Sequence, residues 1–213
     1  SNNTNLIGLD VSYNQLNSLD ISNQALLTSA TASYNNLTQI DLSGNPALEA
    51  FSITNNFLTS LDFSNNLLLE SLNCYNNQIS SITYTTANEL RSFTCADNQL
   101  TSLDVSNMPV LGNLVIAQNQ ITSMDVSSNS VLERFIAFEN NINTHLDFSQ
   151  NPLLDWLFIN DNPIDSMDIS QCPFLDQLNA TATLFTSLDL SNNRLQDNVT
   201  IRNMPNLETV DAR

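Results

Sequence analysis

The chain repeats one pattern of apolar residues nine times, and this repeat constrains its fold more than any other feature. A unit reads Leu-x-x-Leu-x-apolar-x-x-Asn-x-Leu-Thr-Ser-Leu-Asp-apolar-Ser, and successive units begin 21 residues apart except for one step of 22. The units begin at Leu6, Leu27, Leu48, Leu69, Leu90, Leu111, Leu132, Leu154 and Leu175. A unit this short cannot bury its own apolar face, so neighbouring units must stack around one continuous core. The sequence therefore predicts a solenoid.

Each coil of this solenoid is expected to be mainly β. The spacing Leu-x-x-Leu-x-apolar occurs twice in a unit, which predicts two short extended segments joined by two turns. Alternation in the segment 72–75 directs Leu72 and Cys74 inward and leaves Asn73 and Tyr75 outward. With only 3 glycines in the chain and no helical periodicity, we expect little or no helix.

Two polar ladders run through the units. The ninth place carries an asparagine whose amide can satisfy backbone groups of adjacent turns: Asn14, Asn35, Asn56, Asn77, Asn98, Asn119, Asn140 and Asn162. Thr183 interrupts this ladder, which predicts a looser turn there. A carboxylate ladder lies on the second segment: Asp20, Asp41, Asp62, Asp104, Asp125, Asp147, Asp168 and Asp189. We favour turn capping for these carboxylates over a row of calcium sites, because calcium needs six or more converging oxygens.

The unit that runs from Leu69 to Thr85, with its Leu-x-x-Leu-x-Cys-x-x-Asn-x-Ile spacing, resembles the bacterial leucine-rich repeats of the internalin J type. Similar repeats are common in secreted and surface proteins of Bacteroidetes. The resemblance covers nearly all of residues 1–213 and implies a single leucine-rich-repeat domain of about nine to ten repeats. It also implies a right-handed horseshoe with a parallel sheet on its concave face, and recognition or adhesion rather than catalysis.

Charge narrows the range of partners. The chain has 22 acidic and 5 basic residues, a net charge of -17, and all the basic residues are arginines. We expect no binding to nucleic acid, because that affinity depends on Lys and Arg displacing counterions from phosphates. We expect no membrane insertion either, since no apolar stretch approaches the roughly 20 residues that span a bilayer. An acidic, lysine-free surface favours a secreted or cell-surface protein, where salt screens self-repulsion.

The cysteines and the histidine are interpreted as structural. Cys74 and Cys95 occupy the sixth, inward place of consecutive units and are read as reduced core thiols, with a disulfide or a metal as the open alternatives. Cys172 replaces a turn asparagine and is expected to be buried. The extra residue of the 22-residue step falls in the segment 143–145, where we expect a bulge that carries His145 on the surface. No cofactor and no metal are predicted.

Both ends of the sequence interrupt the pattern. The chain opens at Ser1 without an apolar leader and stops within a unit after Ala212, as if cut from a longer array or processed. Open solenoid ends expose unpaired strand edges, which predicts end-to-end association into homo-oligomers. The segment from Gln196 to Asn206 adds about half a coil, and it is open whether this forms a protruding loop or a terminal adaptor.

The first segment of each unit varies at its outward third, fifth and seventh places, which are small and polar in the early units. From the sixth unit they change to an aromatic patch that we define as Val115, Arg134, Ile136, Phe138, Trp156 and Phe158. Stacking in register would put Val115, Ile136 and Phe158 in one row and Trp156 beside Arg134. We expect the patch to be exposed, which is unusual for a monomer. Polar neighbours complete the candidate site: Asn113 and Asn160 on the same face, with Glu139 and Asp161 as an acidic rim.

Three interpretations of this patch stay open: a recognition site, a surface for self-association or for contact with a missing domain, and incidental exposure. A protein partner fits its aliphatic and aromatic character. A glycan would fit if Trp156 and Phe158 offer stacking faces. Catalysis is disfavoured, since the only candidate pair, Glu139 and Asp161, lies on an open sheet with no enclosure to raise a pKa. We therefore predict a non-enzymatic module without catalytic residues.

Overall fold

The computed structural model describes residues 3–195 and 198–212. The chain comprises two compact units, Ser1–Leu100 and Thr101–Arg213. Both units are parallel β-solenoids, with about ten turns in all, and no helix occurs among the described residues. The predicted mainly β solenoid is therefore confirmed.

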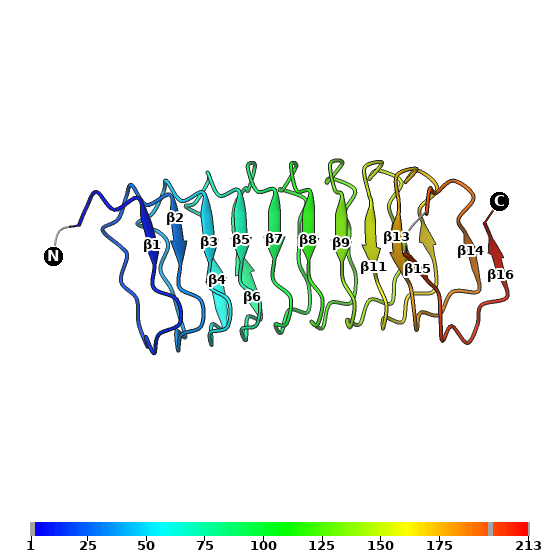
Figure 1. Cartoon of the computed structure of the whole chain (residues 1–213), viewed down its shortest axis with the longest axis horizontal. Helices are drawn as coiled ribbons and strands as arrows, with labels where there is room; N and C mark the ends of the chain where they lie inside the picture. The colour runs from blue at the N-terminus through cyan, green and yellow to red at the C-terminus, as the bar shows by residue number, and fades with distance from the viewer. Residues whose placement is uncertain (1–2, 196–197, 213) are drawn as a thin grey trace. The chain divides into compact units, whose positions relative to one another are not determined.

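The first unit contains a parallel sheet built from the first segment of each repeat. Its strands are β1 (Gly8–Asp10), β2 (Ser29–Thr31), β3 (Ala50–Ser52), β5 (Ser71–Asn73) and β7 (Ser92–Thr94). Central residues exactly one repeat apart are paired, so that Phe51 lies between Ala30 and Leu72. On the opposite side of the coil, β4 (Ser60–Asp62) pairs with β6 (Ser81–Thr83). Figure 1 shows these strands side by side in blue to green.

The second unit repeats this arrangement. Its main sheet contains β8 (Asn113–Val115), β9 (Arg134–Ile136), β11 (Trp156–Phe158), β13 (Gln177–Asn179) and β15 (Asn198–Thr200). The other side holds two strand pairs: β10 (Leu146–Asp147) with β12 (Met167–Asp168), and β14 (Ser187–Asp189) with β16 (Thr209–Asp211). Several second segments stay irregular, so the two halves of a coil differ in regularity (Figure 1).

The segment from Gln196 to Asn206 is part of the solenoid over its described length. Residues 196 and 197 lie outside the described residues, but Asn198–Thr200 forms β15 and pairs with β13 in register. The described part therefore adds another rung to the main sheet and is not a protruding loop. This part of the added half-coil forms a strand because its side chains continue the alternation between inward and outward directions that β13 has.

The asparagine ladder has the predicted role. Asn140 is typical: its Nδ2 donates to the carbonyls of Ile116 (2.9 Å) and Ala137 (3.1 Å), and its Oδ1 accepts the N–H of Ile121 (3.0 Å). Corresponding bonds are made by Asn35, Asn56, Asn77, Asn98 and Asn162. Each amide thus ties two turns together. The Thr183 hydroxyl donates to Ala180 of its own turn (2.9 Å), and the looser turn stays a prediction.

The residue before each ladder position has a positive φ, which the sequence analysis missed. These residues have φ between 53° and 58° and are Tyr13, Tyr34, Asn55, Asn76, Asp97, Gln118, Glu139, Asp161 and Ala182. The conformation turns the chain out of the strand while its N–H still bonds to the next coil, as from Glu139 to the carbonyl of Asn160 (3.0 Å). Left-handed backbone costs most L-residues about 1–2 kcal/mol, so every repeat contains a strained position. No single residue type marks it, and it persists at Ala182, where the inter-coil bond is kept but Thr183 replaces the ladder amide.

The carboxylate ladder caps turns, as predicted. Each Oδ1 accepts the N–H of the serine two residues on at 2.8–3.0 Å, in Asp20, Asp41, Asp62, Asp104, Asp125, Asp147, Asp168 and Asp189. The bond from the Ser127 backbone lowers the pKa of Asp125 because it favours the charged form. Among the residues described, no group of three or more His, Cys, Asp or Glu side chains could hold a metal ion.

The cysteines are buried free thiols, which confirms the reduced interpretation. A hydrogen bond with Cys74, together with burial, raises the pKa of the Cys95 thiol. Cys172 takes over the turn asparagine's role, with its Sγ 3.5 Å from the carbonyl of Phe148 and 3.6 Å from that of Asn151. Burial raises the pKa of the Cys172 thiol to about 12, which keeps this core thiol protonated at neutral pH.

The single 22-residue step is absorbed between Asn140 and Leu146. Asn162 is 22 residues beyond Asn140, whereas Leu146 already pairs with Met167 at the regular spacing of 21. His145 is exposed there, as predicted, and its Nδ1 lies 3.0 Å from the Ser166 hydroxyl. No membrane-spanning helix exists in the part of the chain that the structure describes.

Candidate functional site

The main sheet of the second unit brings the predicted patch together. Register pairing aligns Asn113, Arg134 and Trp156 in one row across β8, β9 and β11. The same pairing aligns Val115, Ile136 and Phe158 in the neighbouring row. Both rows point away from the core because Leu114, Phe135 and Leu157 occupy the inward places between them.

Arg134 and the two aromatic residues of β11 form a connected group. The guanidinium carbon of Arg134 lies 4.2 Å from the centroid of the Trp156 ring, which is a cation–π contact. The Trp156 ring lies 6.0 Å from that of Phe158 with 27° between their planes. These contacts limit the rotamers of all three side chains, so the platform that they form is held in shape before any partner arrives.

The patch is less exposed than its sequence suggested. Arg134 is exposed, but Val115, Ile136, Phe138, Trp156 and Phe158 are each partly buried. Strand spacing of about 4.8 Å is smaller than these side chains, so each one covers its neighbours on adjacent rungs. The expectation of an exposed apolar patch was therefore too strong, because these apolar side chains form a half-buried face.

The polar residues of the rim interact with their neighbours. The carboxylate of Glu139 accepts a hydrogen bond from the Gln118 side chain (3.1 Å). Asp161 accepts one from the Asn160 side chain (2.7 Å). Both acids occupy the left-handed position at the end of a strand, where the chain turns away from the sheet. The rim thus follows the carboxyl ends of the strands, and Asn113 is half-buried in the row of Trp156.

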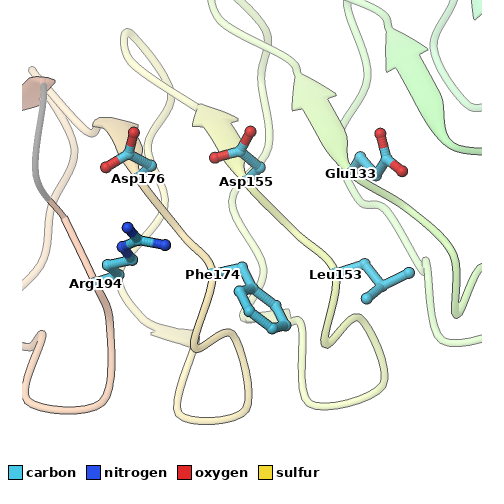
Figure 2. Close-up of a pocket in the computed structure, with 6 residues that line it drawn as sticks. All are labelled: Glu133, Leu153, Asp155, Phe174, Asp176 and Arg194. Carbon is cyan, nitrogen blue, oxygen red and sulfur yellow. The ribbon is translucent and has the colours of Figure 1, made fainter.

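A cleft that the sequence analysis missed lies at the other end of the same strands. We call it the edge cleft. It has a volume of about 410 Å³ and is lined by Glu133, Leu153, Asp155, Phe174, Asp176 and Arg194. In Figure 2 the three carboxylates stand in one row, and Arg194, Phe174 and Leu153 form a second row below them. The acids immediately precede Arg134, Trp156 and Gln177 in the chain, so the edge cleft adjoins the patch.

The backbone fixes the carboxylate row. The N–H of Asp155 donates to the carbonyl of Glu133 (2.8 Å), and the N–H of Asp176 donates to that of Asp155 (3.0 Å). The apolar row is strongly exposed, with Leu153 at 41 % and Phe174 at 54 % of their accessible surface. The signal in the sequence was an acid in the second place of three consecutive units, outside the outward places of the strand itself.

The fold and its repeat define the class: the described chain is a leucine-rich-repeat solenoid. The functional domain of InlJ from Listeria monocytogenes, which includes a cysteine ladder, is similar with a TM-score of 0.92 and 29 % identity, over 97 % of this chain and 46 % of that one. The likeness to internalin J-type repeats predicted from the sequence is thereby confirmed. Here the sixth-place cysteines are Cys74 and Cys95.

Two further solved structures share the fold at lower identity. The leucine-rich-repeat domain of APL1B gives a TM-score of 0.75 at 21 % identity, over 91 % of this chain and 61 % of that one. The plant peptide hormone receptor RGFR1 in complex with RGF2 gives 0.67 at 15 %, over 94 % of this chain and 41 % of the receptor. This chain therefore spans less than two thirds of each of the three proteins. No family model and no curated protein sequence matches it.

Proposed function

We propose that the chain is a non-enzymatic recognition module, secreted or at a cell surface, that binds a protein partner through the aromatic patch. The observation that carries this proposal is the connected group of Arg134, Trp156 and Phe158. Tryptophan and arginine dominate binding energy at protein interfaces, where they are surrounded by partly buried contacts that exclude water. A preformed platform also lowers the entropy that binding must overcome.

The fold itself supports a protein partner. RGFR1, which has the same fold, is seen in complex with RGF2, and a chain of the LRIM1/APL1C complex also has this fold. In this chain the constant half of each repeat maintains the coil, while the variable half displays different side chains on each rung. Such a division allows a partner to be selected by surface residues without any change in the core.

Binding to arrays of surface proteins and of glycans tests the proposal. The double substitution Trp156→Ala and Phe158→Ala should weaken binding to a protein by at least about 30-fold, corresponding to roughly 2 kcal/mol. The matched control is Ser71→Ala with Asn73→Ala, because these residues occupy the same two places of the fourth repeat. The control should bind like the unaltered chain.

The alternatives give distinct results in the same experiment. Binding restricted to oligosaccharides and lost with Trp156 and Phe158 would replace the protein partner by a glycan. A molar mass that rises with concentration and falls to the monomer in the double variant would identify a self-association surface. Protein binding that survives the double substitution unchanged would overturn the assignment to the patch.

A further inference from the structure

We infer that the edge cleft receives a lysine or arginine side chain of the partner polypeptide, which makes the recognition specific for a basic residue beside an apolar one. The inference rests on the proposed function, since it concerns the same partner and an adjoining surface. The cleft and the patch are continuous, because Glu133 and Asp155 directly precede Arg134 and Trp156 on β9 and β11.

The two walls of the edge cleft match the two parts of a basic side chain. Leu153 and Phe174 are 41 % and 54 % exposed and offer apolar surface to a methylene stem. Glu133 and Asp155 lie above them on adjacent rungs and line the same cleft, as Figure 2 shows, and their carboxylates would accept hydrogen bonds from the cationic head. Long cationic side chains bury their stems and keep their charged ends beside polar groups in this way.

Charge complementarity selects this occupant over an apolar or acidic one. The chain carries a net charge of -17, and a row of carboxylates about one strand spacing apart repels itself. Among the described residues, none donates a hydrogen bond to the side chain of Glu133 or Asp155. Arg194 lies at the far end of the cleft, near Asp176, and leaves these two acids open to a cation from outside (Figure 2).

An extended peptide could occupy both surfaces together. Its basic residue would enter the edge cleft while a neighbouring aromatic or aliphatic residue lies against Trp156 and Phe158. The contact of Arg134 with the Trp156 ring already places one cation over that face, so the partner's own basic group is directed to the free carboxylates. The expected binding motif is therefore one basic residue flanked by apolar residues.

Two capped peptides test this inference: acetyl-Gly-Phe-Arg-Phe-Gly-amide and its citrulline counterpart, which keeps the shape but lacks the charge. Trp156 is the only tryptophan, so its fluorescence reports binding at the patch, and calorimetry serves for variants that lack it. We expect the arginine peptide to bind about tenfold more tightly at low salt and the preference to shrink at high salt. The double substitution Glu133→Gln and Asp155→Asn should remove the preference.

The matched control is Glu49→Gln with Glu70→Gln, which changes the same place of two adjacent repeats and the same net charge. This control should retain the preference for arginine. Equal binding of both peptides, no binding of either, or a preference that survives in the Glu133 and Asp155 double variant would overturn the inference. Equal binding of the two peptides that depends on Trp156 and Phe158 would contradict the inference but agree with the proposed function. An arginine preference that does not depend on these two residues would support the role of the cleft and contradict that of the patch.

Discussion

Single buried side chains decide how firmly one coil holds the next. From Asn35 to Asn162 the ladder amides lie inside the solenoid with no more than 8 % of their surface exposed, and each replaces backbone hydrogen bonds that the turns cannot make by themselves. Removing one partner of a buried hydrogen bond costs more than the bond contributes, because the other partner stays desolvated. The asparagines are therefore as necessary as the leucines that surround them.

The substitution Asn140→Ala should lower the free energy of unfolding by about 2 kcal/mol, since the buried Ile121 N–H loses its partner. The carbonyls of Ile116 and Ala137 each lose one of two amide donors and keep Asn119 and Asn162, respectively. Asn141→Ala is the matched control, because this neighbouring asparagine is exposed and should change stability by less than about 0.5 kcal/mol. Urea unfolding followed by circular dichroism measures both. Equal midpoints for the two variants would contradict the structural role of the ladder.

Between each strand and the turn that follows it lies one residue with a strained, left-handed backbone. Ala182 has a φ of 58° and lacks the local hydrogen bonding that makes this conformation acceptable to asparagine or aspartate. The position could not be recognised in the sequence because tyrosine, glutamine, glutamate and alanine occupy it as well as asparagine and aspartate. At Ala182 the N–H bond to the carbonyl of Arg202 in the next coil (2.9 Å) holds the left-handed backbone, although Thr183 takes the place of the ladder amide.

Replacing Ala182 by glycine should raise the unfolding free energy by about 0.5 kcal/mol, because relief of left-handed strain exceeds the added entropy of the unfolded chain. Ala180→Gly provides the contrast, because this alanine is fully buried at the end of the strand. The unfolding free energy of this variant should fall by about 1 kcal/mol. Thermal unfolding measures both changes. Destabilisation by Ala182→Gly equal to that of Ala180→Gly would show that the backbone is not strained there.

The carboxylate ladder links the stability of both units to pH. Serine hydrogen bonds lower the pKa of Asp20, Asp41, Asp104, Asp125 and Asp147. A folded-state pKa below the unfolded value near 3.9 gives stability that is complete above that value and is lost as the pH falls through the folded pKa. The effect of each exposed carboxylate is small, and the repeat multiplies it.

The midpoint of urea unfolding should stay nearly constant from pH 7 to about pH 5 and fall below about pH 4. Asp125→Asn tests the cause, because an amide oxygen can still accept the Ser127 N–H but has no charge to lose. This variant should lose less stability between pH 5 and pH 3 than the unaltered chain. A midpoint that rises as the pH falls would mean that relief of carboxylate repulsion outweighs the caps.

Much of the architecture was predictable because the repeat is both local and periodic. The spacing of Leu111, Leu132 and Leu154 specifies which side chains face inward, and in-register stacking then places Arg134 beside Trp156 without further information. The positions of the turn asparagines and capping aspartates follow from the same period. The roles of these residues could be predicted from the sequence because a buried amide or a turn carboxylate must form hydrogen bonds with nearby backbone groups.

The sequence by itself determined the solenoid, its register and the row of unusual outward residues, since a fixed period leaves one way to stack the units. Tertiary structure decided how far Phe158 and its neighbours are covered, and that Leu153 and Phe174 line the same cleft as Glu133 and Asp155. These properties depend on side-chain reach between rungs and on the path of the turns. The position of a residue in the repeat determines the direction of its side chain. How far that side chain is covered depends on the residues that lie next to it in space.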